Sequence, residues 1–126
     1  MTTRGLTLVI LSALLTVVAN LLMRAGVDRA GGFPSQLAEI PSGLLRLLMQ
    51  PLFDIGFVSY GISALIWFRV IGSEPLSTAY PLLVSITFML VTLGAVILFK
   101  ERITWGKVIG LLIILFGIFI IGKESS

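Results

Sequence analysis

Four long apolar runs, each ending at charged or proline-containing segments, dominate the chain. They cover about residues 6–23, 55–71, 76–99 and 108–121. A helix needs about 20 apolar residues to cross roughly 30 Å of hydrocarbon. Backbone polar groups in lipid must also find partners within their own segment, as they do in a helix. The pattern therefore predicts an all-α membrane protein, with four transmembrane helices in one domain of residues 1–126.

One long connection, residues 26–50, joins the first two spans. It begins with the turn-like stretch GVDRAGGFPS. Residues of about 36–49 then place apolar side chains at helical spacing, with Glu39 and Arg46 off that stripe. This segment is too short to cross a bilayer alone, so we expect a short helix lying on the membrane interface. The alternative is an extension of the second span.

Composition supports lipid as the main solvent. The chain has 126 residues, of which 57 % are hydrophobic and 12 % charged, and a soluble domain of this size carries more charge. Cys and His are absent, which removes thiol chemistry and most transition-metal sites. No catalytic, cofactor-binding or metal-binding set is recognisable, so we expect no enzyme activity. Lys and Arg are scattered between apolar runs, which argues against nucleic-acid binding.

Charge placement predicts an orientation. The first and third loops hold six basic residues, whereas the termini and the second loop hold three. By the positive-inside rule, the first and third loops face the cytoplasm and both termini face outward. Insertion in both orientations stays open. A signal peptide at the first span is disfavoured, because its apolar region is long and three further spans follow.

The first span carries a polar stripe at a spacing of four residues, formed by Ser12, Thr16 and Asn20 and continued by Arg24. Polar residues inside a span are costly and need a reason. One interpretation is a polar wall along a substrate path. The other is hydrogen bonding between helices or to the helix's own carbonyls. The second is favoured for Ser12, and both stay open for Asn20.

The second span places Tyr60, Ser63 and Trp67 on one face, and Arg69 follows. These side chains can line the same path, although Trp67 also fits an interfacial aromatic belt. Arg69 can reach water by snorkelling or can offer its guanidinium to a phosphate.

The third span carries Tyr80, Pro81 and Ser85, together with several threonines. Pro81 can kink the helix, or it can be a tolerated first-turn proline. No Asp or Glu lies in the middle of any span. A proton-coupled carrier normally needs such a buried titratable group.

The last span has Gly106, Gly110 and Gly117 on one face. Small residues let helices approach closely. Because a four-span chain is too small to enclose a path alone, we interpret this face as a dimer contact.

From Ser63 to about Gly122 the chain resembles the small multidrug resistance superfamily, which is related to the larger drug/metabolite transporters. The features that carry the resemblance are Pro75, Ala79-Tyr80, Glu101-Arg102, the glycines of the last span and Leu22-Met23-Arg24. The resemblance covers nearly all of the chain except residues 26–50.

Two departures point to one branch of that superfamily. The membrane glutamate of the drug and guanidinium exporters falls on Thr16, and their tryptophan after the Ala-Tyr pair falls on Leu83. Proton-coupled drug efflux is therefore disfavoured. The sequence is more similar to the subunits proposed to flip aminoarabinose-phosphoundecaprenol. The shared features are Ala79-Tyr80-Pro81, Val91 to Ala95, Glu101, and Asn20 followed by Arg24.

That resemblance implies a flippase of a polyprenyl-phosphate-linked sugar in the bacterial cytoplasmic (inner) membrane. It also implies a homodimer or heterodimer, often with protomers in opposite orientation. The polar groove would bind sugar hydroxyls, and Arg24 or Arg69 would pair with phosphate. The alternatives are a small-molecule exporter and a non-transporting scaffold for a membrane glycosyltransferase. The predicted substrate-binding residues are Thr16, Asn20, Arg24, Tyr60, Trp67, Arg69, Tyr80, Pro81 and Ser85.

Overall fold

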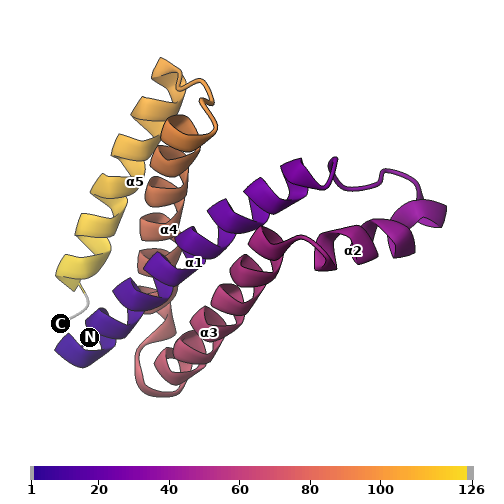
Figure 1. The fold of residues 1–126 in the computed structure, drawn as a ribbon. Coiled ribbons are helices and arrows are strands. Elements are labelled where there is room, and N and C mark those ends of the chain that lie inside the picture. Colours follow the sequence, from indigo (N-terminus) through magenta and orange to yellow (C-terminus); the bar gives the residue numbers. More distant parts are fainter. Residues whose placement is uncertain (1, 125–126) are drawn as a thin grey trace.

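The computed structural model describes residues 2–124 and is almost entirely helical (Figure 1). Helices make up 85 % of the structure, and no strand occurs among the described residues. In order, the elements are α1 (Thr3–Arg29), a 3₁₀ turn (Leu37–Glu39), α2 (Ile40–Leu48), α3 (Pro51–Ser73), α4 (Leu76–Leu98) and α5 (Trp105–Glu124). Four of them, α1, α3, α4 and α5, are long and apolar enough to cross a membrane. The predicted all-α fold with four membrane-spanning helices is confirmed.

Helix α1 extends past its apolar run, through part of the segment expected to be a turn. It continues to Arg29, and the chain turns at Gly31 and Gly32, whose φ angles are 89° and 91°. Arg24 and Asp28 form an ion pair one helical turn apart, with 3.3 Å between Nε and Oδ1. Such pairs support helix formation beyond the hydrophobic stretch.

Two glycines bring α1 and α3 into close contact. A Cβ atom at Gly26 would lie 2.6 Å from the backbone nitrogen of Phe53, and one at Gly56 would lie 2.9 Å from the carbonyl oxygen of Ala19. Real side chains do not tolerate such contacts with backbone, so both positions require glycine. The close approach places polar groups of the two helices within hydrogen-bond distance.

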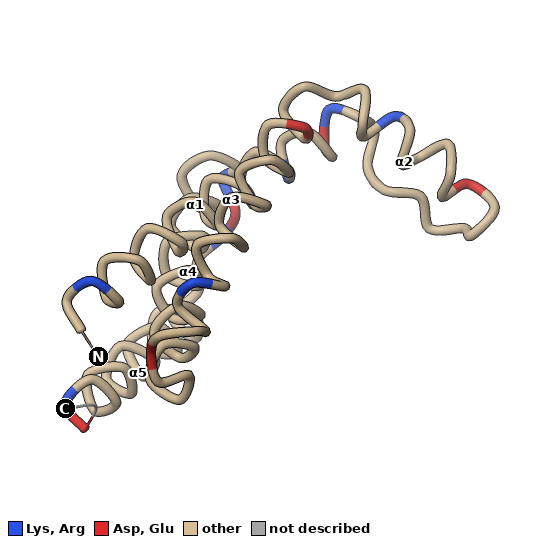
Figure 2. The backbone as a smooth tube through the Cα atoms, turned by 90° about the horizontal axis from the view of Figure 1, so that it is seen from below, with Lys and Arg blue, Asp and Glu red and all other residues tan. Residues whose placement is uncertain are grey.

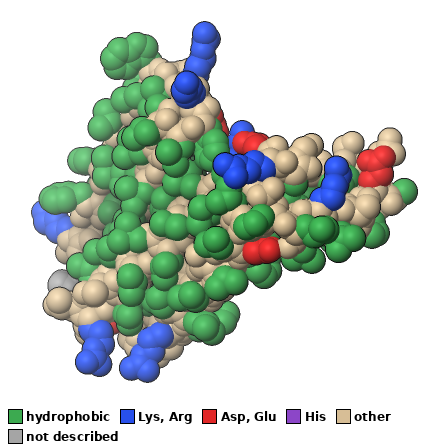
Figure 3. Space-filling view, viewed as in Figure 1, with side chains coloured by type: hydrophobic (Ala, Val, Ile, Leu, Met, Phe, Trp, Pro, Cys, Tyr) green, Lys and Arg blue, Asp and Glu red, His purple; other side chains and the backbone are tan. Residues whose placement is uncertain are grey.

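Helix α4 packs against α1, and α5 packs mainly on α4. Val9, Val70 and Ala79 form a small buried cluster where α1, α3 and α4 meet. No described residue of α5 is buried. Hydrophobic side chains cover most of the face seen in Figure 3, and charged side chains lie near its ends and along α2. Along the backbone the charged residues are separated by long uncharged stretches of helix (Figure 2).

The N-terminal end of the bundle is tied by Glu74, in the turn between α3 and α4. The backbone N–H of Thr2 donates to Glu74 Oε2 at 3.3 Å, and the Thr2 hydroxyl donates to Oε1. Thr2 also caps α1 by accepting from the N–H of Gly5 at 3.0 Å. Glu74 therefore holds the start of α1 against the α3–α4 turn.

Helix α2 projects away from the bundle (Figure 1). Gly43 and Leu47 are its buried residues, and Leu44, Leu45 and Leu48 are exposed. An exposed leucine face is what an interfacial helix presents to lipid, and its position on the membrane stays a prediction.

Candidate functional site

A groove of about 560 Å³ lies between α1, α3 and α4. It combines hydroxyl, amide and aromatic side chains with a smaller number of aliphatic ones. Val84 and Phe88 at its edge are about half exposed, so the groove opens on the outer surface of the bundle. Its lining residues are Ser12, Thr16, Asn20, Tyr60, Ser63, Ala64, Trp67, Tyr80, Leu83, Val84, Thr87, Phe88 and Val91.

Ser12 and Ser63 form the floor of the groove. Ser12 Oγ donates to the carbonyl of Ser63 at 3.1 Å, and Ser63 Oγ donates to the carbonyl of Ser12 at 2.8 Å. Both residues are almost fully buried. This is the helix–helix hydrogen bonding favoured for Ser12 by the sequence, and it leaves both hydroxyls engaged.

Thr16 and Asn20 come next along α1, and Asn20 has more unused hydrogen-bonding groups than Thr16. The Thr16 hydroxyl lies 2.8 Å from the carbonyl of Ser12 and is also bonded to Ser63 Oγ. Asn20 Nδ2 donates to the carbonyl of Thr16 at 3.0 Å. Because a side-chain amide has two N–H groups and a carbonyl oxygen, Asn20 keeps a donor and an acceptor for a ligand.

Aromatic side chains form the opposite rim. The Trp67 and Tyr80 rings meet across α3 and α4 with centroids 6.0 Å apart at an angle of 54°. Trp67 also packs on the buried cluster of Val9, Val70 and Ala79. Tyr60 and Tyr80 are about half exposed, so their surfaces remain accessible to a ligand.

Thr87 is the groove residue that the sequence did not single out. Its Oγ1 is buried and has no hydrogen-bond partner, alone among the buried side-chain polar atoms described. An unsatisfied buried hydroxyl is unfavourable by about 1–3 kcal/mol. The sequence signal was only one more threonine in the third span. The lack of a hydrogen-bond partner for the Thr87 hydroxyl depends on how the helices pack, which the sequence does not show.

Five predicted site residues therefore come together, whereas Arg24, Arg69, Pro81 and Ser85 lie outside the groove lining. Ser85 is buried, and Arg69 is exposed. Helix α4 continues through Pro81 as a single element. The roles of these residues stay predictions.

Arg24 faces acidic partners at the opposite end of the bundle from Glu74. Its Nη1 lies 3.4 Å from Glu101 Oε2, and its Nε lies 3.3 Å from Asp28. Its guanidinium carbon lies 5.3 Å from the centre of the Phe99 ring. The charge of Arg24 is therefore already paired with two carboxylates, which engage two of its five N–H donors.

The chemistry available in the groove is neutral hydrogen bonding and aromatic packing. Its lining contains no carboxylate or basic side chain. Among residues 2–124, no group of three His, Cys, Asp or Glu side chains is placed to hold a metal ion. Hydroxyls, an amide and aromatic faces suit a polar, uncharged ligand such as a sugar ring better than a cation.

Similar proteins occur among bacterial flippase subunits. The chain is 38 % identical to the probable 4-amino-4-deoxy-L-arabinose-phosphoundecaprenol flippase subunit ArnF of Serratia proteamaculans, over 91 % of this chain and 89 % of that protein. It is 36 % identical to the ArnF subunit of Shewanella sediminis, over 98 % and 91 %. It is 33 % identical to the ArnE subunit of Yersinia pestis, over 90 % and 91 %. No protein-family profile and no solved structure matches the chain.

Proposed function

We infer the function from the family to which the chain belongs. This is the family of 4-amino-4-deoxy-L-arabinose-phosphoundecaprenol flippase subunits, a branch of the small multidrug resistance superfamily. The protein is a multi-pass protein of the bacterial inner membrane. It is a subunit of a flippase that moves a polyprenyl-phosphate-linked sugar across that membrane. Family membership points to a transporter and not to a catalyst.

The observation that carries this function is the uncharged polar groove open at the side of the bundle. A flippase must hide the polar headgroup of its cargo from hydrocarbon while the prenyl chain stays in lipid. Asn20 has a free donor and acceptor, and the buried Thr87 hydroxyl lacks a partner. A sugar hydroxyl bound there would supply the missing hydrogen bonds, which a buried polar group requires.

The groove also disfavours proton-coupled export of cationic drugs. Export of cationic drugs by exchange for protons needs a titratable acid within the membrane. Thr16 stands where the related exporters carry that acid, and its hydroxyl is already bonded to Ser12 and Ser63. The positive charge of an amino sugar is balanced by the phosphate of the same lipid, so such a cargo needs no acid in the groove.

We propose that a second subunit of the same family completes the transporter. Relatives of this chain carry two subunit names, ArnF and ArnE, which supports a heterodimer. Helix α5 has no buried residue, so its surface is left for a partner. A Cβ at Gly117 would meet nothing within 4 Å, whereas Gly110 of the same predicted face lines the cavity between α4 and α5. The relative orientation of the subunits stays a prediction.

The test is flipping of the lipid-linked aminosugar in proteoliposomes containing the full chain with any subunit that accompanies it. Asn20→Ala and Thr87→Val are expected to slow flipping by about tenfold or more, since each removes a hydrogen bond to a buried ligand. Thr7→Val is the matched control, because the Thr7 hydroxyl only bonds the carbonyl of Thr3, outside the groove. Normal flipping by both groove variants at normal protein levels would refute the assignment of the groove.

A further inference from the structure

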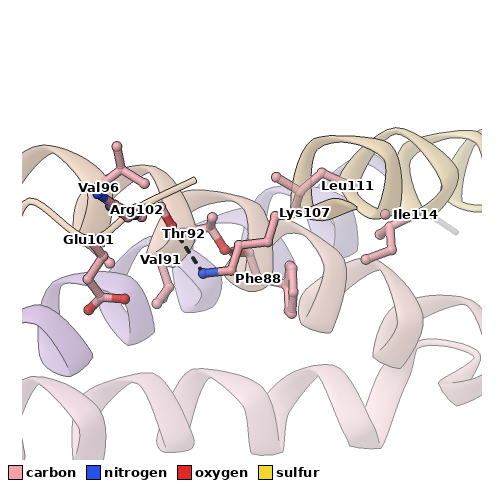
Figure 4. A pocket seen from close by; sticks show the side chains of 11 residues that line it. Phe88, Val91, Thr92, Val96, Glu101, Arg102, Lys107, Leu111 and Ile114 are labelled. Atoms are coloured by element: carbon pink, nitrogen blue, oxygen red, sulfur yellow. Dashed lines mark hydrogen bonds between the residues drawn. The ribbon is translucent and has the colours of Figure 1, made fainter. Parts of the chain in front are cut away.

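A second cavity, of about 340 Å³, lies between α4 and α5 (Figure 4). Its inner part is apolar, with Ala95, Leu111 and Ile114 among its walls. Its mouth carries Arg102, from the α4–α5 loop, and Lys107, from the first turn of α5. A cavity with an apolar interior and a cationic mouth is complementary to an anionic amphiphile.

Both cations at this mouth keep free donors. Lys107 Nζ donates to the carbonyl of Arg102 at 3.2 Å, and an ammonium group has three N–H donors. Two of them are therefore available. Among the described residues, the guanidinium of Arg102 has no carboxylate within ion-pair distance. Both ion pairs found in that part of the chain are formed by Arg24. In Figure 4 the Lys107 side chain extends over the cavity towards the loop.

One acid also lines the cavity, and its charge is already compensated. The Glu101 carboxylate forms an ion pair with Arg24 of α1 at 3.4 Å. In Figure 4 it points away from the Lys107 amine. The mouth therefore presents two cations without a competing carboxylate partner. Charge-assisted hydrogen bonds from such groups are the usual means of holding a phosphate.

The two cavities adjoin along α4. Phe88 and Val91 line both of them, so the two cavities share part of α4 as a wall. Charge placement predicts that the α4–α5 loop lies on the cytoplasmic side. A lipid with its phosphate at Lys107 would therefore lie next to the wall that the cavity shares with the groove.

We propose that Lys107 and Arg102 form a phosphate seat for the polyprenyl-phosphate lipid at the cytoplasmic face. The prenyl chain lies against the apolar wall between α4 and α5. The headgroup then passes Phe88 and Val91 to reach the groove. This inference rests on the proposed flippase function, and it moves phosphate recognition from Arg24 and Arg69 to two residues outside the predicted site.

Binding of three probes tests the seat: undecaprenyl phosphate, undecaprenol and phosphatidylglycerol. The protein is the full chain with any accompanying subunit, in detergent micelles, measured by native mass spectrometry. The double variant Arg102→Gln/Lys107→Gln is expected to weaken undecaprenyl phosphate binding by about tenfold, since each exposed charge pair contributes up to about fivefold. Undecaprenol binding should not change. Lys100→Gln is the matched control, because Lys100 lies in the same loop but outside the cavity lining.

Four results would overturn the proposal in distinguishable ways. If the unmodified protein binds undecaprenyl phosphate no better than undecaprenol, the proposed substrate class is wrong and the seat with it. If the unmodified protein prefers the phosphate and the double variant binds it equally well, the flippase function survives and the seat is wrong. If phosphatidylglycerol binds as tightly and shows the same loss, the seat serves a bilayer phospholipid. A Lys100→Gln variant that weakens binding equally would show a general charge effect.

Discussion

Ser12 and Ser63 each donate a hydroxyl hydrogen bond to the other's backbone carbonyl, at 3.1 and 2.8 Å, and so join α1 to α3 within their membrane-spanning segments. Neither hydroxyl can donate to a ligand, because each has one proton and that proton is engaged. The polar stripe of α1 is therefore divided. Its buried end holds the bundle together, and its more open end, at Asn20, faces the groove.

Removing the Ser63 hydroxyl should destabilise the α1–α3 pair. Hydrogen bonds between membrane helices contribute about 0.6 kcal/mol on average and at most about 1.7 kcal/mol. Ser63 also bonds Thr16, so we expect Ser63→Ala to lower the free energy of unfolding by about 1 kcal/mol. Titration with a denaturing detergent measures it. Ser59→Ala is the control on the same helix, since its hydroxyl only bonds the carbonyl of Ile55. Equal stability of the two variants would contradict a stabilising role for the Ser12–Ser63 hydrogen bonds.

Gly56 should not accept a side chain, unlike Gly61 on the same helix. A Cβ at Gly56 would lie 2.9 Å from Met23 N and from the carbonyl of Ala19, whereas a Cβ at Gly61 meets nothing within 4 Å. Overpacking of this kind typically destabilises by about 1–3 kcal/mol. We therefore expect Gly56→Ala to lower the unfolding temperature and Gly61→Ala to leave it unchanged or raise it. The same response at both positions would mean that the α1–α3 contact is looser than described.

Glu74 should make the stability of the N-terminal end depend on pH. The hydrogen bonds from Thr2 lower the pKa of the Glu74 carboxyl below its ordinary value. A group with a lowered folded-state pKa contributes stability at neutral pH, and that contribution is lost as pH falls through the folded pKa. Glu74→Gln should therefore lower the unfolding temperature near about pH 7 but make little difference near about pH 3. An effect of Glu74→Gln that persists in acid would rule out the carboxylate as its cause.

Arg24 and Glu101 should behave as a single unit. Their ion pair joins α1 to the α4–α5 loop, and both side chains are substantially exposed. Exposed pairs contribute about 0–1 kcal/mol. We expect Arg24→Gln, Glu101→Gln and the double variant to show similar small losses of stability, with non-additive effects in a double-mutant cycle. If Arg24→Gln instead abolishes flipping while Glu101→Gln does not, Arg24 itself contacts the phosphate.

The sequence predicted the fold because its strongest signals are local. Four apolar runs of sufficient length require helices in lipid, and the four membrane-spanning helices confirm this. The ends of the helices were predicted less accurately. The Arg24–Asp28 pair and the backbone contact at Gly26 extend α1 to Arg29, and neither can be recognised from hydrophobicity.

The candidate site was predictable only where residues share a helix face. The spacing of Thr16 and Asn20, and of Tyr60 and Trp67, placed each pair on one side of a helix, and the groove contains all four. Contacts between elements distant in the chain were not accessible to this reasoning. Glu74, for example, accepts two hydrogen bonds from Thr2, which lies 72 residues earlier in the chain.

Trp67 should report on ligand in the groove. It lines the groove beside Tyr80, whereas Trp105, the other tryptophan, is 82 % exposed at the start of α5. In a Trp105→Phe background, Trp67 is the only tryptophan, and its emission should shift on addition of the undecaprenyl-phosphate-linked aminosugar. Undecaprenyl phosphate, which lacks the sugar, should produce a smaller change because its headgroup leaves the groove empty. Asn20→Ala should move the response to higher ligand concentration. An identical response to both lipids would place the sugar outside the groove.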